Sequence, residues 1–146
     1  MIKRIVFDMD NTLVDEFGST LRPGITALLK ELKGRGCELY LWTSSTRGRA
    51  KEILSLHGLD RYFTKCVFRE DYDLENRGVR KDIRKIGGRM LIDDDPAEVE
   101  HVRRLGLKGY LIKPYRKNSR TSDAEYRDIM KMVTAEEGLF KKIFKS

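Results

Sequence analysis

Short apolar runs alternate with longer amphipathic stretches along the chain. Residues that favour β-strands, such as Val, Ile, Phe and Tyr, are frequent in the short runs, which lie at 5–7, 38–42, 65–68, 89–92 and 108–112. Between them, apolar residues recur at three- and four-residue spacing, which predicts helices over 22–33, 47–56, 79–86 and 97–105. The same spacing predicts a C-terminal helix from Ser122 onward, continued past Gly138 by Leu139, Ile143 and Phe144.

Strands that alternate with helices in this way indicate βαβ units around a parallel sheet. The sequence therefore predicts an α/β fold, a Rossmann-like three-layer sandwich with a central, mainly parallel sheet. A chain of 146 residues is the size of one domain, and we expect residues 122–146 to form a helical extension of it. Right-handed crossovers would bring the strand ends after residues 7, 42 and 92 to one edge of the sheet.

The composition limits the kind of substrate or partner and the cellular compartment that we expect for the protein. A formal net charge of +7 and a sequence pI near 9.5 suit an anionic substrate or partner. No apolar run approaches the roughly 18 residues that a membrane helix needs, and the first strand follows the N-terminus so closely that we expect no signal peptide. The two cysteines, Cys37 and Cys66, are too few for a zinc cluster. We expect them to be free thiols in a reducing cytoplasm.

Polar clusters follow three of the predicted strands. Asp8 and Asp10 come directly after the first strand, 43–46 after the second and 93–95 after the fourth. Residues i and i+2 of an extended chain share a face, and two carboxylates placed in this way repel each other unless a cation lies between them. An Asx-rich turn would explain Asp8 and Asp10 equally well. The recurrence of polar clusters at one sheet edge favours a site, because open α/β sheets bind ligands there.

A phosphate monoester at that edge would meet the groups that its hydrolysis requires. Asp8, at the strand tip, is the candidate nucleophile, and Asp10 can protonate the leaving oxygen and later activate water. A carboxylate that attacks a phosphate dianion needs a hard divalent cation, and Mg²⁺ suits oxygen ligands. Asp94 or Asp93 would complete the coordination of that ion.

Further polar groups are candidates for phosphate binding. The hydroxyl of Thr43 and the backbone amides of Ser44 and Ser45 precede a predicted helix, and four basic residues precede the fourth cluster: Arg80, Lys81, Arg84 and Lys85. Each has a structural alternative, since Thr43 and Ser44 suit a helix cap, Asp95-Pro96 is a typical helix start, and a lysine on a charged helix is usually solvated. Their joint occurrence at one edge favours the phosphate site.

These residues resemble the four motifs of the haloacid-dehalogenase superfamily, whose members are mostly phosphatases that form a phosphoaspartate. The resemblance covers about residues 1–112 and rests on Asp8-Met9-Asp10-Asn11-Thr12, Thr43, Lys81 and Asp93-Asp94. It implies Asp8 as nucleophile, Asp10 as general acid and base, and Thr43 and Lys81 as phosphate ligands. It also implies Mg²⁺ held by Asp8, the backbone carbonyl of Asp10 and an acid of the last motif. For that acid we favour Asp94, with Asp93 orienting Lys81.

Within this superfamily, two places can carry a cap domain, one just after the first motif and the other between the helix after the second strand and the lysine. Here those gaps are residues 14–21 and roughly 60–78, and both are too short for a cap. In this superfamily, members without a cap act on macromolecular substrates, or they form an assembly in which another subunit supplies the lid. Residues 41–45, 65–70, 80–83 and 91–96 are similar to the capless phosphatases related to the RNA polymerase C-terminal-domain phosphatases, although Asn11 replaces their usual Glu and their small inserted sheet is absent.

The substrate class stays open at this point. The phosphatase domain of phage-type polynucleotide kinase-phosphatases, which acts on nucleic acid ends, is also capless, and the basic stretch over 113–120 is either part of the site edge or a solvated linker. We predict a Mg²⁺-dependent phosphomonoesterase whose substrate is large: a phosphoprotein or a nucleic acid end, with a small phosphate ester as the other possibility. The alternatives are a non-catalytic phosphate-binding module of the same fold and a small-molecule phosphatase completed by oligomerisation.

Overall fold

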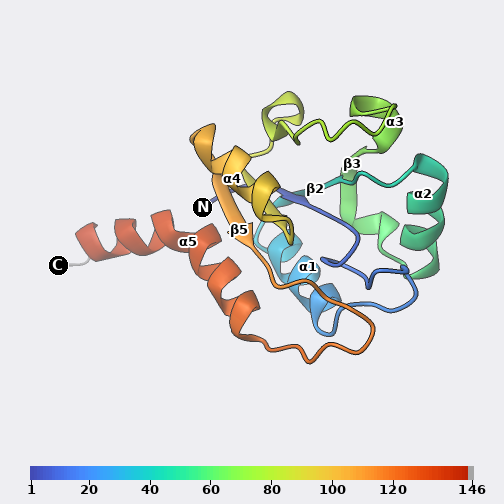
Figure 1. The fold of residues 1–146 in the computed structure, drawn as a ribbon. Coiled ribbons are helices and arrows are strands. Elements are labelled where there is room, and N and C mark those ends of the chain that lie inside the picture. Colours follow the sequence, from blue (N-terminus) through green and yellow to red (C-terminus); the bar gives the residue numbers. More distant parts are fainter. Residues whose placement is uncertain (145–146) are drawn as a thin grey trace.

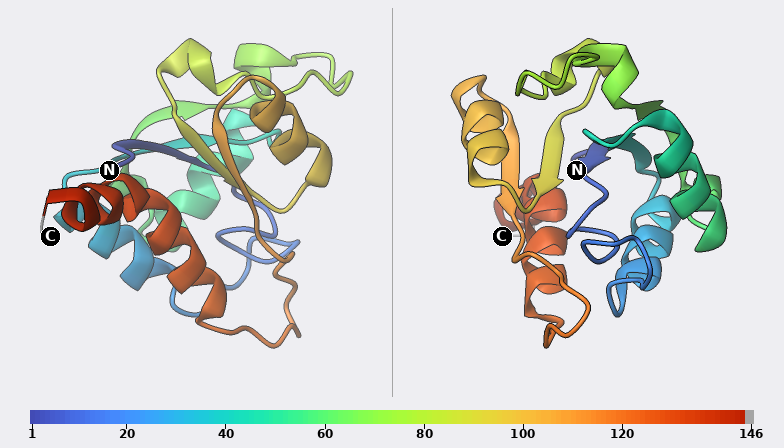
Figure 2. Two further views of the ribbon diagram at one scale, coloured as in Figure 1. Left: turned by 90° about the vertical axis from the view of Figure 1, so that its left-hand side faces the viewer. Right: turned by 45° about the vertical axis from the view of Figure 1, so that its right-hand side comes forward.

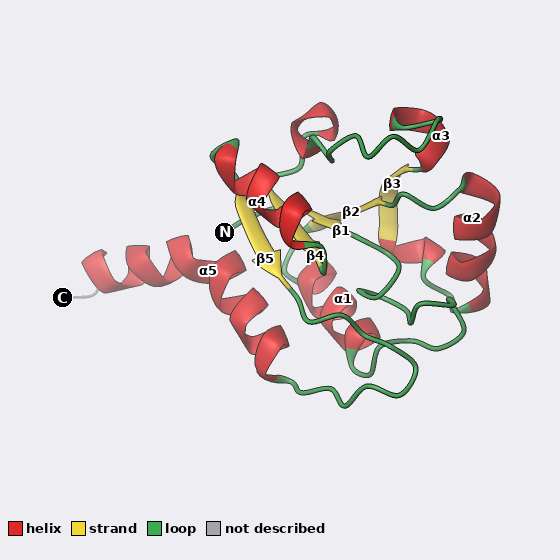
Figure 3. Cartoon of the chain, in the orientation of Figure 1, coloured by secondary structure: helices red, strands yellow, loops and turns green. Residues whose placement is uncertain are grey.

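A computed structural model describes residues 1–144, with side-chain surroundings for residues 1–135, as a sheet covered by helices on both faces (Figure 1). The end of the predicted C-terminal extension, 145–146, and the side chains of Leu139, Ile143 and Phe144 lie outside the described residues. The strands are β1 (Arg4–Phe7), β2 (Glu38–Trp42), β3 (Phe63–Val67), β4 (Met90–Asp93) and β5 (Lys108–Leu111). The helices are α1 (Ile25–Gly34), α2 (Arg47–Leu56), α3 (Arg69–Tyr72), α4 (Pro96–Arg104) and α5 (Ala124–Phe144), with the 3₁₀ turns η1 (Asp60–Tyr62) and η2 (Ile83–Ile86) (Figure 3).

Strand β1 lies at the centre of the sheet. The strand order is β3-β2-β1-β4-β5, and every neighbouring pair is parallel. Because helices cover both faces of β1, its residues Ile5, Val6 and Phe7 are all fully buried. The predicted α/β fold with a central parallel sheet is confirmed.

Alternate residues of β1 point to opposite faces of the sheet and into two hydrophobic cores. Ile5 and Phe7 belong to the larger core, to which α1, α2 and the buried residues Ile129 and Val133 of α5 contribute. Val6 belongs to the smaller core on the other face, together with residues of α4 and η2. The views in Figure 2 show helices on both sides of the sheet. The two cores fix the three layers, and they fix β1 between its neighbours.

The segment predicted as a helix over 79–86 is helical only in the 3₁₀ turn η2. The residues before η2 are held by side chains instead of by helical carbonyls. The carboxylate of Asp73 accepts the backbone N–H groups of Arg77, Gly78 and Val79 at 2.8, 2.9 and 3.1 Å. Val79 is consequently 49% exposed, and the charged loop predicted at 69–78 begins with the short helix α3 instead.

In the described part of the chain, the two gaps in which a cap domain could be inserted contain no cap domain. Residues 14–21 form turns and two isolated bridges, one between Asp10 and Val14 and one between Val14 and Leu21. Residues 60–78 contain η1, β3 and α3. Both segments therefore belong to the core domain.

The two cysteines are not joined by a disulfide, as predicted. The thiol of Cys37 donates to the backbone carbonyl of Ile2 at 3.4 Å, and burial raises the pKa of the Cys66 thiol. Among the helices of residues 1–144, none has the length and apolar character that crossing a membrane requires.

We expect Asp73→Ala to lower the free energy of unfolding by about 1–3 kcal/mol, because three backbone N–H groups lose their acceptor. Urea denaturation followed by circular dichroism measures this loss. Glu75→Ala is the matched control, since Glu75 lies in the same loop but pairs with the exposed side chain of Arg77 and should contribute less than about 0.5 kcal/mol. Equal losses in the two variants would show that Asp73 does not hold the loop.

Candidate active site

The carboxyl ends of the central strands surround a hollow of about 520 Å³. The strands on the two sides of β1 belong to different parts of the chain, β2 on one side and β4 on the other, and open α/β sheets bind ligands at such a switch point. The site residues predicted from the sequence line this hollow, except for Thr43: Asp8, Asp10, Ser44, Lys81, Asp93 and Asp94.

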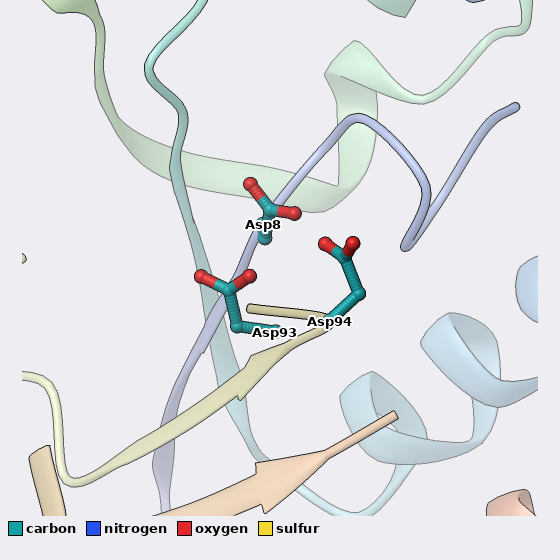
Figure 4. A group of neighbouring side chains, drawn as sticks. All are labelled: Asp8, Asp93 and Asp94. Carbon is teal, nitrogen blue, oxygen red and sulfur yellow. The ribbon is translucent and has the colours of Figure 1, made fainter. Parts of the chain in front are cut away.

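Three carboxylates from two strand ends converge in the hollow. Oxygens of Asp8, Asp93 and Asp94 lie within 4.8 Å of one another, and Figure 4 shows the three side chains turned toward a common space. Thr12 contacts two of them, because its hydroxyl lies 3.0 Å from Asp8 Oδ2 and 3.3 Å from Asp94 Oδ1. The structure thus brings together the polar clusters that follow β1 and β4.

The ammonium of Lys81 lies between two of these carboxylates. Its Nζ donates to Asp8 Oδ1 at 2.9 Å and to Asp93 Oδ2 at 2.8 Å, and the residue is 4% exposed. The backbone N–H of Lys81 donates to Glu98 Oε2 of α4 at 3.0 Å. The other oxygen of Asp93 accepts the N–H of Asp95 at 3.0 Å. Lys81 and Asp93 are therefore each fixed from two sides.

The sequence offered further candidates for this site besides Lys81, and three of them, Arg80, Arg84 and Asp95, have structural partners. Arg80 pairs with Glu98 at 2.7 Å on the rim of the hollow, and Arg84 pairs with Asp82 at 2.9 Å. Asp95 caps α4 by accepting an amide N–H of its first turn at 2.9 Å. The cation in contact with the carboxylate cluster is Lys81.

Burial makes negative charge costly in this hollow. It raises the pKa of Asp8 to about 6 although Lys81 opposes the shift, and it raises the pKa of Asp93 to about 7, with the charge of Asp8 adding to the effect. Burial also raises the pKa of Asp94. Burial disfavours the Lys81 ammonium as well, yet the carboxylates of Asp8 and Asp93 outweigh it and raise the pKa of Lys81 above its usual value. One stable positive charge therefore faces three acids.

A divalent cation fits this arrangement. When all three acids are ionised, a single ammonium leaves two negative charges uncompensated, and the raised pKa values of Asp8 and Asp93 express that cost. Each of the three carboxylates offers one oxygen to a common ion, and hard cations such as Mg²⁺ prefer oxygen ligands. Asp94 is less buried than Asp93, which is 1% exposed, and it shares the Thr12 hydroxyl with Asp8. Asp94 is therefore the more accessible partner for Asp8 in holding such an ion.

The loop after β2 forms the rim of the hollow next to α2. Thr43 is buried and its hydroxyl accepts the N–H of Ser45 at 3.0 Å, whereas Ser44 is exposed on the rim. The helix-capping alternative does not hold, because the N-cap of α2 is Thr46 and makes no side-chain capping bond. Arg69 fixes the loop by donating from Nε to the carbonyl of Ser44 at 2.8 Å.

The side chain of Asp10 is engaged by Arg49 of α2. Oδ2 of Asp10 accepts from Nη1 of Arg49 and Oδ1 accepts from Nη2, each at 2.9 Å. Nη1 also donates to the hydroxyl of Ser45 at 2.9 Å. Asp10 therefore lines the hollow apart from the carboxylate cluster. The sequence interpretation did not single out Arg49.

The comparison with protein families decides the assignment. Residues 3–142 match the family described as NLI interacting factor-like phosphatase. The chain belongs to this family. It is thus a phosphatase of the haloacid-dehalogenase superfamily, in the branch of the C-terminal-domain phosphatases, as the motifs predicted.

Solved structures share the fold of this phosphatase. A hydrolase from Streptococcus pneumoniae has a TM-score of 0.67 at 16% identity, covering 88% of this chain and 98% of that chain. A HAD-superfamily hydrolase of subfamily IA from Geobacter sulfurreducens has a TM-score of 0.62 at 14% identity, covering 90% of this chain and 100% of that chain. No curated protein matches the chain.

A buried arginine positions the first motif of the phosphatase. Arg22, 3% exposed, donates from Nε to the carbonyl of Thr12 at 2.8 Å and from Nη2 to the carbonyls of Asn11, at 3.1 Å, and Lys113. It also pairs with Glu125 of α5 at 3.6 Å. Arg22 therefore joins the motif loop, the segment after β5 and α5. The sequence showed it only as the residue before a helix start, so its role was missed.

In the phosphatase without a divalent cation, Asp8 should make stability fall as the pH rises. Its pKa is about 6 in the folded state and about 3.9 when unfolded, so between these values the folded protein binds more protons. Asp8→Asn, which cannot ionise, should therefore gain stability relative to the wild type between about pH 4 and pH 7, by about 1–3 kcal/mol.

Urea denaturation with a chelator at several pH values measures this gain. Asp60→Asn is the control, because Asp60 is an exposed acid on η1 and does not line the hollow. A stability difference between Asp8→Asn and the wild type that does not change with pH would contradict the prediction.

Proposed function

We propose that this phosphatase depends on Mg²⁺ and forms a phosphoaspartyl intermediate on Asp8 while acting on a large phosphorylated substrate. The observation that carries the proposal is the buried ammonium of Lys81, 2.9 Å from Asp8 and 2.8 Å from Asp93. A fixed positive charge beside the nucleophile reduces the repulsion between a carboxylate and a phosphate dianion. The family match supports the same chemistry.

In the first step, the phosphoryl group moves to Asp8. An Asp8 oxygen forms a bond to phosphorus, the bond to the ester oxygen breaks, and that oxygen takes a proton from Asp10. In the second step, a water oxygen attacks phosphorus while Asp10 takes a proton from the water, and the bond between phosphorus and the Asp8 oxygen breaks. Inorganic phosphate leaves, and Asp8 and Asp10 return to their starting states. Lys81 and the amide of Ser44, which both line the hollow, are the proposed phosphate contacts, with Thr43.

Mg²⁺, when bound, would supply further neutralisation of the phosphate oxygens. Asp8 and Asp94 would hold it, with the backbone carbonyl of Asp10, as the superfamily resemblance implies. Asp93 would orient Lys81, because it is 1% exposed and its Oδ2 accepts from the Lys81 ammonium at 2.8 Å. The uncompensated negative charge of the hollow supports this assignment.

The shape of the rim supports a large substrate. Loops 14–21 and 60–78 are too short to form a lid, and the rim residues Ser44, Val79 and Arg80 are exposed. The net charge of +7 favours a polyanionic substrate. A small-molecule phosphatase completed by a second subunit is the alternative. A non-catalytic binding module is disfavoured, because each proposed catalytic position holds a competent side chain.

We expect Asp8→Asn to reduce phosphate release by at least about 10³-fold, because it removes the nucleophile. Phosphate release is measured on a sugar phosphate, a nucleotide, a phosphopeptide and a 3′-phosphorylated oligonucleotide, each with Mg²⁺ and with chelator. Asp60→Asn is again the matched control and should keep the wild-type rate. An unchanged rate in Asp8→Asn would rule out Asp8 as the nucleophile. Wild-type inactivity on the whole panel would favour the binding-module reading.

Mg²⁺ should raise the melting temperature more at pH 8 than at pH 5. Protons and the cation compete for Asp8 and Asp94, because burial raises the pKa of both carboxyls, that of Asp8 to about 6, and so favours their protonated forms at pH 5. Differential scanning fluorimetry with Mg²⁺ or chelator measures the shift. Asp94→Asn should abolish most of it, whereas Asp95→Asn should retain it, because the Asp95 carboxylate caps α4 and is not one of the three clustered acids. Equal shifts at both pH values would argue against binding at this cluster.

A further inference from the structure

A second hollow adjoins the candidate active site on the side of α2. It has a volume of about 460 Å³ and shares Asp10 and Ser44 with the first hollow. Its other charged lining residues are Glu16, Arg49 and Arg69. Since Asp10 is the proposed proton donor to the leaving oxygen and lies where the two hollows meet, the second hollow is the space that a leaving group would enter.

Arg49 occupies both oxygens of Asp10 in this structure. The two hydrogen bonds are each 2.9 Å long, and the side chains are 40% and 27% exposed, so the pair reaches solvent. A carboxylate whose two oxygens both accept from one guanidinium is held facing that guanidinium, so neither oxygen can turn toward the leaving group. At least one of these bonds must therefore open before Asp10 acts as a general acid.

A second phosphate on the leaving group would open them. Phosphate accepts bidentate hydrogen bonds from a guanidinium as a carboxylate does, and it would compete with Asp10 for Arg49. The Arg49 side chain is 40% exposed, so it can turn toward the hollow without disturbing the core. Arg69 lines the same wall, held there by its bond to the carbonyl of Ser44.

The charges around the second hollow are compatible with such an anion. Glu16 is the acid that faces Arg49 and Arg69 there. Its carboxylate is itself engaged, 3.6 Å from the guanidinium of Arg116 and 3.1 Å from the backbone N–H of Lys117. The two arginines that line the hollow are therefore not neutralised by Glu16.

We propose that Arg49 is a positioning residue that couples the release of Asp10 to a second phosphate on the leaving group. The preferred substrate is then a phosphate monoester with another phosphate nearby on the same molecule. That second group is a phosphomonoester in a bisphosphorylated small molecule, or the neighbouring phosphodiester at a nucleic acid end. The proposal deepens the proposed function and rests on its assignment of Asp10.

The test compares substrates that differ by one phosphate. Adenosine 3′,5′-bisphosphate is compared with the 3′- and 5′-monophosphates, and chromatography identifies the phosphate released. We expect kcat/KM to be at least about ten-fold higher for the bisphosphate in the wild type and less than about two-fold higher in Arg49→Met. The gain should appear in kcat, because Asp10 becomes available, whereas a mere binding contact would lower KM alone. Arg49→Lys, which keeps the charge without the fork, should restore part of the preference.

Arg47→Met is the matched control. It removes the same charge from the first turn of the same helix, but Arg47 pairs with Asp71 and does not line the second hollow, so the preference should persist. A 3′-phosphorylated oligonucleotide, compared with the bisphosphate, distinguishes the two sources of the second phosphate. Thermal unfolding of each variant verifies that it is folded.

A wild-type preference for the bisphosphate below two-fold would overturn the proposal, and so would a preference that Arg49→Met retains. Faster hydrolysis of a phosphopeptide than of every substrate with a second phosphate would also overturn it. p-Nitrophenyl phosphate separates this failure from failure of the proposed function. If the wild type hydrolyses it and Asp8→Asn does not, the proposed function stands even when the role of Arg49 falls. If the wild type turns over no substrate at all, both fall.

Discussion

The cost of burying negative charge governs this end of the fold. Asp8, Asp93 and Asp94 follow or end buried parallel strands, so the backbone holds their oxygens within 4.8 Å of one another. The sheet cannot relax to separate them, because β1 and β4 are paired and covered on both faces. Compensation has to come from elsewhere in the chain, and Lys81 supplies one charge. A bound cation is the natural source of the remainder.

This requirement explains why loops around the site are held by polar side chains instead of regular structure. Lys81 must reach inward from a segment between α3 and η2, and a helix there would commit its N–H groups to other carbonyls. Asp73 and Glu98 accept those N–H groups instead. Arg22 serves the first motif in a comparable way, with three carbonyls from two segments accepting from one guanidinium. The buried cations Lys81 and Arg22 are thus each satisfied by several partners, which is the condition for tolerating a buried charge.

Much of this arrangement could be predicted from the sequence, because a local pattern of residues determines the strands, whereas contacts between different segments determine the rest. The strands carry their own signal in short apolar runs, and parallel crossovers then bring Asp8 and Asp93 to one edge whatever the details of packing. The helix predicted over 79–86 was wrong because the carboxylates of Asp73, just before that segment, and of Glu98, well after it, accept backbone N–H groups of the segment and override the local apolar pattern. Arg22 and Arg49 were missed because a basic residue at a helix start looks the same whether it is solvated or buried against a distant loop.

The absence of a cap places one further demand on this phosphatase. Asp10, the proposed acid and base, lies at the rim of an open hollow. Its side chain is 27% exposed and therefore accessible to water. In a lidded enzyme, closure excludes water and completes the catalytic groups together. Here the constraint on Asp10 comes from within the domain, because Arg49 belongs to α2 and donates to both oxygens of Asp10. Helix α2 in turn packs its apolar face into the larger core. The Asp10 side chain is therefore held by a helix that also borders the second hollow. In the role that we propose for Arg49, selection of the leaving group and control of Asp10 fall to the same residue.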